Sequence, residues 1–220
     1  MLISSDHKTV VLGVPKTGSK TILSVLSSSA GFVGREHSTY PQLILAAESA
    51  LNLPINDTVE KIYVFWRDPV DRFMSAANFI RSSAVDWLMR RNPELFPDEN
   101  IPQMGIKPVV SNNAKGIAAT ITPLQIFEDE LTRVSGSSPT NICPWLIKQS
   151  HWIDKLDPRV IVLDYANFNQ NLILVATDFG LTITSSDIPR INESVKLSQN
   201  LSPSLEARVR EYYADDYLLV

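Results

Sequence analysis

A short basic loop of small residues follows an apolar run near the start of the chain, at 9–14. The loop reads Pro15-Lys16-Thr17-Gly18-Ser19-Lys20-Thr21. Apolar residues at helical spacing follow from Ile22, so a helix is expected directly after the loop. Backbone N–H groups at a helix start lack intrahelical partners and lie at the positive end of the helix dipole. The stretch therefore predicts a cradle for a phosphate group.

The commonest phosphate loop, Walker A, fits this stretch poorly. It requires a glycine, four residues, and then Gly-Lys-Ser/Thr. Gly13 and Gly18 have that separation, but the Lys-Thr pair comes one residue late, at 20–21. No expected strand ends in an aspartate suited to magnesium, because Asp68 is better placed as a helix cap. A magnesium-dependent nucleoside triphosphatase is therefore disfavoured.

A second polar cluster follows another apolar run, 61–66, and begins with Arg67. Asp68 and Pro69 are typical of the cap and the first residue of a helix, and Ser75 falls on that helix. A guanidinium at the carboxyl end of a strand can bind a phosphate through two hydrogen bonds, and a nearby hydroxyl can add a third. The sequence therefore predicts a second phosphate site, separate from the loop.

The two motifs together resemble the sulfotransferases that use 3′-phosphoadenosine 5′-phosphosulfate (PAPS). In that family a strand ends in Pro-Lys-Thr-Gly followed by small hydroxyl residues, and a later strand is followed by Arg, Asp or Asn, Pro, and a helix with Arg and Ser. The resemblance implies that Lys16 reaches the bridging oxygen and the sulfuryl group, and that 18–21 surround the 5′-phosphate. It assigns Arg67 and Ser75 to the 3′-phosphate. Lys20 stands where the family more often has Thr or Ser.

Weaker similarity to the carbohydrate-type members extends over 144–152, 160–165, 190–194 and 211–217. The cofactor-binding residues that the resemblance implies are Pro15, Lys16, Thr17, Gly18, Ser19, Lys20, Thr21, Arg67, Ser75 and Asn192. It implies transfer of a sulfuryl group to a hydroxyl on a carbohydrate or small metabolite, with 3′,5′-bisphosphoadenosine (PAP) as the other product and no metal.

An acceptor hydroxyl has a high pKa and needs a general base. His37 follows the first expected strand–helix unit, where the chain should return to the carboxyl edge of the sheet, and Glu36 is its neighbour. Several branches of the family use a His or Glu in this region. The catalytic residues expected are therefore Lys16 and His37, with Glu36 as the second candidate for the base.

Two other functions remain open from the sequence. One is a P-loop nucleotide or small-molecule kinase, which would need magnesium and a nucleoside triphosphate. The other is a non-catalytic nucleotide-binding module that has kept the fold without the chemistry.

Strand-like and helix-like segments alternate along the chain. Buried strands are expected at 8–14, 61–66 and 159–163, and the short segment 31–36 is a candidate for one more strand. Helices are expected at 21–26, 40–51, 70–80, 122–134, 168–179 and 205–213. The alternation predicts an α/β protein of the P-loop-containing three-layer α/β/α class, with a central parallel sheet. We expect one domain over 1–220, in which the proline-rich segment 81–141 is a substrate-side insertion or lid.

Composition narrows the class of protein. A net charge of −4 argues against an extended nucleic-acid surface, and 44% hydrophobic residues indicate a globular chain. The single Cys143 excludes an internal disulfide and gives no metal cluster. No apolar run is long enough to span a membrane, and the first strand begins within ten residues of Met1, which leaves no room for a signal peptide. The expected location is the cytoplasm.

Two further polar sites have structural interpretations. Arg72 is expected to form an ion pair with Asp68 or Asp71 on its own helix. Asp215 and Asp216 are expected to be a solvated helix end.

Overall fold

The computed structural model describes residues 2–32, 42, 45, 48–49, 58–91, 122–136, 145–189, 191 and 201–220. The chain divides into two compact units. The first takes in Met1–Arg72, Ile147–Asn192 and Arg210–Val220, and the second takes in Phe73–Leu146 and Glu193–Val209. The segment expected as an insertion, 81–141, falls inside the range of the second unit. That this segment is a lid within one domain stays a prediction.

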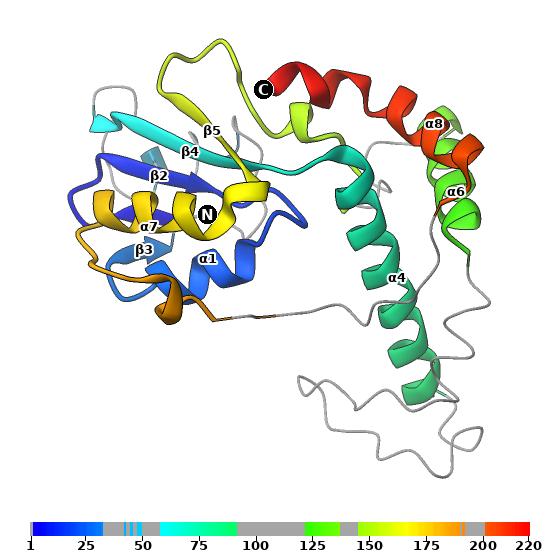
Figure 1. Ribbon diagram of the computed structural model, residues 1–220, viewed down its shortest axis with the longest axis horizontal. Coiled ribbons are helices and arrows are strands. Elements are labelled where there is room, and N and C mark those ends of the chain that lie inside the picture. The colour runs from blue at the N-terminus through cyan, green and yellow to red at the C-terminus, as the bar shows by residue number, and fades with distance from the viewer. Residues whose placement is uncertain are drawn as a thin grey trace. The chain divides into compact units, whose positions relative to one another are not determined.

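A five-stranded sheet forms the centre of the first unit (Figure 1). Its strands are β1 (Leu2–Ser4), β2 (Thr9–Leu12), β3 (Ala30–Phe32), β4 (Lys61–Trp66) and β5 (Val160–Asp164), in the order β3-β1-β2-β4-β5. β2, β4 and β5 pair in parallel, whereas β1 is antiparallel to both β2 and β3. The fold is therefore α/β, as predicted, but the sheet is mixed, and the prediction of a parallel sheet is wrong for β1.

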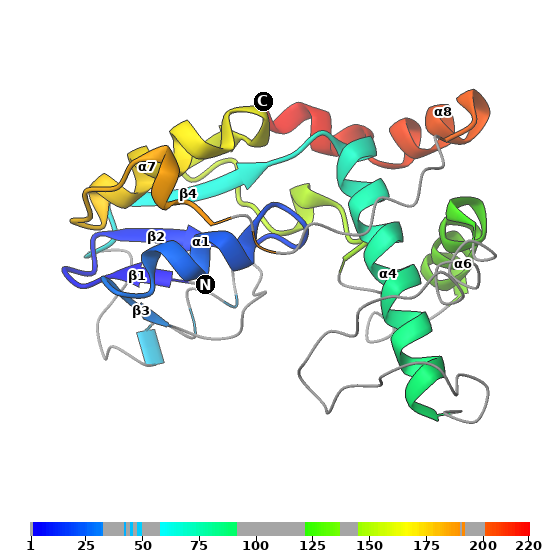
Figure 2. The same ribbon diagram turned by 60° about the horizontal axis from the view of Figure 1, so that its bottom comes forward.

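The turn from β1 to β2 accounts for the antiparallel strand, which the apolar pattern does not predict. The Asp6 carboxylate accepts hydrogen bonds from Ser4 Oγ at 2.6 Å and from the Lys8 amide at 3.1 Å. Ser4 Oγ in turn accepts from the Thr9 amide at 3.0 Å. His7 takes the left-handed conformation, with φ of 63°. These local bonds fix a tight reversal, so that a strand of only three residues pairs between β2 and β3 (Figure 2).

β2 and β4 are buried on both faces, as their unbroken apolar sequences predict. Side chains alternate along a strand, so Val11, Tyr63 and Phe65 lie on one face. Two helices, α1 (Ser19–Leu26) and α7 (Phe168–Asp178), cover this face and lie in front of the sheet in Figure 1. α7 ends at Asp178, just before Gly180, whose φ is 75°, and the sequence predicts this glycine as the stop.

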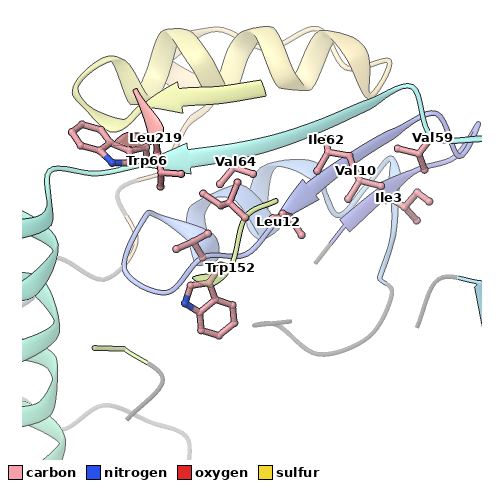
Figure 3. Close-up of a cluster of buried hydrophobic side chains, with 11 residues drawn as sticks. Ile3, Val10, Leu12, Val59, Ile62, Val64, Trp66, Trp152 and Leu219 are labelled. Atoms are coloured by element: carbon pink, nitrogen blue, oxygen red, sulfur yellow. The ribbon is translucent and has the colours of Figure 1, made fainter. Parts of the chain in front are cut away.

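The opposite face of the sheet carries Val10, Leu12, Ile62 and Val64, the alternate residues of the same strands. Figure 3 shows Trp152 and Leu219 among the buried side chains of this face. Trp152 follows η3 (Gln149–His151), and Leu219 closes η6 (Ala214–Leu219), so two short 3₁₀ segments contribute to this core.

α4 (Pro69–Arg91) begins where the sequence predicts. Asp68 Oδ1 accepts hydrogen bonds from the amides of Val70 at 2.9 Å and Asp71 at 3.1 Å, which makes Asp68 the predicted N-cap. The helix runs well past the expected end near 80. Its last residue, Arg91, lies two positions before Pro93.

The second unit contains α6 (Pro123–Gly136), close to the predicted 122–134. Thr122 Oγ1 accepts from the Gln125 amide at 3.2 Å, and Gln125 Oε1 accepts from the Thr122 amide at 2.8 Å, which closes the start of the helix. Phe127 packs edge-on against Phe73 at 5.7 Å and lies under the guanidinium of Arg208 at 5.4 Å.

The remaining expected helices fare differently. The final one is α8 (Pro203–Tyr212), against a prediction of 205–213. Of the predicted 40–51, the described residues 42, 45, 48 and 49 are helical, and the others lie outside the described part. No helix in the described part of the chain is long and apolar enough to cross a membrane.

Candidate functional site

Three chain segments meet at one edge of the sheet because β2, β4 and β5 are parallel (Figure 1). The loop 13–18 follows β2, Arg67 follows β4, and Tyr165 follows β5. The carboxyl ends of parallel strands are the usual place for a ligand in an α/β sheet. The two predicted phosphate motifs therefore emerge at the same edge.

The loop holds two backbone angles of positive φ, 70° at Lys16 and 87° at Gly18. A lysine in this region is uncommon, and such strain concentrates at functional sites. Turns that combine left-handed and ordinary residues can direct several N–H groups into one anion-binding concavity. The two positive φ angles are compatible with the predicted phosphate cradle, which stays a prediction.

Helix α1 starts immediately after the loop, with Gly18 as its N-cap. No side chain caps this end, and no acidic residue occupies the first turn. The first helical bond runs from the Ile22 amide to the Gly18 carbonyl at 3.0 Å. The N–H groups of the first turn are therefore not taken by a side-chain cap, and the helix dipole adds positive potential there.

Gly18 is required by its neighbours as well as by its conformation. A Cβ at this position would lie 2.6 Å from Phe168 Cε2 and 3.3 Å from Tyr165 Cε2. The two rings are 5.0 Å apart, and Phe168 also packs at 5.2 Å against Phe65. The loop therefore packs closely against the rings of Tyr165 and Phe168, which both follow β5 in the chain.

The predicted loop residues divide into structural and accessible ones. Pro15 and Thr17 are buried, and the Thr17 hydroxyl donates to the Val14 carbonyl at 2.9 Å, so it fixes the loop from inside. Thr21 is 7% exposed, Ser19 is half-buried and Lys20 is exposed on α1. The hydroxyl of Thr17 is thus used within the loop, whereas Ser19 is partly accessible and Lys20 is exposed.

Arg67 connects the second motif to the loop. Its Nη1 donates to the Lys16 carbonyl at 3.3 Å, and its guanidinium carbon lies 4.8 Å from the centre of the Tyr165 ring. Its Nε is buried and has no hydrogen-bond partner among the described residues. A buried donor without a partner costs free energy, so the Arg67 side chain is held here by its contacts with Lys16 and Tyr165 rather than by a bond at Nε.

A buried carboxylate holds the segment beside Arg67. Asp216 accepts hydrogen bonds from the amides of Gln149 at 2.9 Å and Ser150 at 2.8 Å, and its carbonyl accepts from Trp66 Nε1 at 2.8 Å. The Gln149 side chain then bonds to both backbone groups of Arg67. The prediction of a solvated aspartate pair is wrong for Asp216, which is 0% exposed.

Arg72 forms the ion pair with Asp216, not with Asp68 or Asp71. Its Nη2 lies 3.8 Å from Asp216 Oδ2 and donates to the Ile147 carbonyl at 2.7 Å. Burial lowers the pKa of Arg72, while Tyr213 and Asp216 act in the opposite direction. Asp68 and Asp71 do not pair with Arg72, because the Arg72 side chain is buried in the core. Asp216, which is also buried there, is the carboxylate beside it.

The other predicted residues are not all brought to this edge. Ser75 is half-buried on α4 and belongs to the second unit, so its pairing with Arg67 stays a prediction. Glu36, His37 and Asn192 lie outside the described residues. Within the described part, no group of three or more His, Cys, Asp or Glu side chains is arranged to hold a metal.

Three residues of the site are absent from the sequence analysis as site residues. Tyr165 follows β5 as Arg67 follows β4, so the same rule could have found it, although β5 is half-buried and not buried as predicted. Gln149 and Asp216 carry no such signal, because their roles depend on contacts across the fold.

Comparison with known proteins finds no relative. No protein-family model, no curated protein and no solved structure matches the chain significantly. A ligand for this edge of the sheet can therefore be proposed only from the residues of the chain itself.

We expect Gly18→Ala to destabilise the fold more than Gly180→Ala. Both glycines have positive φ, but nothing lies within 4 Å of a Cβ at Gly180. Gly180→Ala should therefore cost about 1 kcal/mol for backbone strain alone. Gly18→Ala should cost about 1 kcal/mol or more beyond that, because the Phe168 ring must shift. Urea unfolding measures both, and equal losses would contradict the close packing of the loop.

We also expect Asp216→Asn to lower the free energy of unfolding by about 3 kcal/mol or more, because it removes the negative charge that faces the buried Arg72 guanidinium. Asp215→Asn is the matched control. Asp215 is exposed and pairs with Lys148 at 2.7 Å, so its loss should cost less than about 1 kcal/mol. Similar unfolding midpoints for the two variants would show that the buried pair does not hold this region.

Proposed function

We propose that this chain is a PAPS-dependent sulfotransferase that sulfates a hydroxyl on a carbohydrate or small metabolite. The observation that carries the proposal is the place of Arg67. Its guanidinium bonds to the backbone of the predicted phosphate loop at Lys16, so the two predicted phosphate motifs are in direct contact. A ligand with phosphates at two positions of one ribose accounts for both motifs, whereas a triphosphate accounts for one.

The residues present fit such a ligand. The loop and the first turn of α1 offer N–H groups to the 5′-phosphate, with Ser19 and Lys20 at hand. Arg67 offers a half-buried guanidinium to the 3′-phosphate. Ser75 and Asn192 are assigned to the nucleotide by the resemblance alone. The three-layer P-loop fold and the cytoplasmic location belong to the proposal in the same way.

The chemistry asked of the protein is positioning and charge stabilisation. When bound, the donor supplies a sulfuryl group activated by its bond to a 5′-phosphate oxygen. A base takes the acceptor's proton as the acceptor oxygen bonds to sulfur, and the old sulfur–oxygen bond breaks with its electron pair left on that phosphate oxygen. Lys16 and the loop amides are proposed to stabilise this negative charge. One such donor typically contributes about 10²–10³ in rate.

Ligand-dependent thermal stability tests the cofactor proposal. We expect PAP to raise the melting temperature of the wild type and ATP with magnesium to raise it little. At a hundred times its Kd, a ligand stabilises the fold by about 2.7 kcal/mol. Arg67→Ala should abolish most of the PAP shift. Arg159→Ala is the matched control, because Arg159 lies at the opposite end of a parallel strand and pairs with Asp157.

The outcomes separate the three functions. A shift with magnesium ATP alone would favour the kinase and contradict the sulfotransferase proposal. A PAP shift that Arg159→Ala loses as completely as Arg67→Ala would contradict the assignment of Arg67. A PAP shift without transfer from PAPS to any of a panel of hydroxyl acceptors would favour the non-catalytic module.

The proposed base gives a separate kinetic test. We expect His37→Ala to lower the rate of sulfuryl transfer by about 10²–10⁴ while the PAP-induced thermal shift is retained. His7→Asn is the matched control, because His7 lies in the turn from β1 to β2, where asparagine tolerates the positive φ. Near-normal turnover by His37→Ala would transfer the role to Glu36 or elsewhere.

A further inference from the structure

Arg67 lies just beyond the hydrogen-bonded part of the sheet. The ladder between β4 and β5 ends with Trp66 opposite Asp164, and the ladder between β2 and β4 ends with Leu12 opposite Val64. Neither neighbouring strand therefore supplies partners for the Arg67 backbone. A residue in this position would ordinarily be bonded to water and free to change its backbone angles.

The Gln149 side chain takes the place of the missing strand. Its Oε1 accepts from the Arg67 amide at 3.0 Å, and its Nε2 donates to the Arg67 carbonyl at 2.8 Å. One side-chain amide thus pairs with the donor and the acceptor of one residue, as a peptide group of a neighbouring strand would. Gln149 is 0% exposed, so water does not compete for these bonds.

The backbone of Gln149, from which this side chain extends, is itself held in place. Its own backbone N–H and that of Ser150 donate to the two oxygens of the buried Asp216 carboxylate. Asp216 is held in turn by Arg72. The position of the Arg67 backbone is therefore set by a chain of buried polar contacts that begins near the end of the sequence.

The side chain of Arg67 has restraints of its own, the Lys16 carbonyl at Nη1 and the Tyr165 ring against its guanidinium. These restraints act at its far end. They give a fixed Nε only if the Cα from which the side chain extends is also fixed. Because bidentate binding of a phosphate depends on the orientation of the guanidinium plane, a small rotation of the backbone would weaken it.

We propose that Gln149 is a positioning residue that sets the preference of this site for a ligand with a 3′-phosphate. This inference rests on the proposed function, because it takes Arg67 as the 3′-phosphate ligand. Gln149 touches neither phosphate nor sulfuryl group in this proposal. It acts through Arg67, by holding that backbone where strand pairing has ended.

The test compares PAP with adenosine 5′-monophosphate, which lacks only the 3′-phosphate. The dissociation constant of the monophosphate divided by that of PAP, both measured by calorimetry, isolates the contribution of the 3′-phosphate. A larger ratio means a stronger preference for PAP. We expect Arg67→Ala to reduce the ratio by about 10- to 100-fold, the loss typical of a charged hydrogen bond. Gln149→Ala should reduce it by about tenfold and leave binding of the monophosphate nearly unchanged.

Two more variants complete the experiment. Gln149→Met keeps a side chain of similar length but removes both the acceptor for the Arg67 amide and the donor to its carbonyl, so its ratio should match that of Gln149→Ala. Gln170→Ala is the matched control, since Gln170 is exposed on α7 and should leave the ratio unchanged. Amide hydrogen exchange at Arg67 should accelerate in Gln149→Ala and remain slow in Gln170→Ala.

The outcomes distinguish this inference from the proposed function. A wild type that binds PAP no better than the monophosphate would overturn both. A wild-type preference that Gln149→Ala retains in full, with unchanged exchange at Arg67, would overturn the role of Gln149 alone. Parallel loss of both ligands in Gln149→Ala would show a general structural role and would also overturn it.

Discussion

The candidate site depends on one buried contact, the ion pair between Arg72 and Asp216. Both side chains are fully buried, so each charge would be costly without the other. Asp216 uses its remaining capacity to fix the start of η3, from which Gln149 reaches the backbone of Arg67. A carboxylate close to the carboxyl terminus thereby determines where an arginine at residue 67 lies. The arrangement couples the stability of the first unit to the geometry of the candidate site.

The edge itself follows from strand direction. β2, β4 and β5 are parallel, so the loop, Arg67 and Tyr165 emerge together although the sequence separates them widely. The antiparallel β1 leaves this arrangement unchanged, because it pairs on the far side of β2. Because position 18 is a glycine, the loop can pack closely against the Phe168 ring. Backbone strain at Lys16 is held at the same place, which is consistent with a preorganised anion site.

Sequence patterns predicted most of the first unit because its signals are local. Unbroken apolar runs identified β2 and β4, the Asp68-Pro69 pair identified the start of α4, and Gly180 identified the end of α7. They did not predict β1, whose three residues are too short for a periodic signal, or the extension of α4 beyond residue 80. In the candidate site, the loop and Arg67 were found by the same local logic, whereas Gln149 was not.

The sequence by itself determined the chemistry that is available: a basic loop at a helix start, an arginine after a second buried strand, and the α/β alternation that brings them to one edge. Only the tertiary structure decided how that chemistry is arranged. It used the Thr17 hydroxyl inside the loop, placed Arg67 against Tyr165, and gave Arg72 a partner more than a hundred residues away. The physical reason is that spacing along the chain reports contacts within one helix or strand. Burial of a charge instead requires whichever countercharge the fold brings into the core.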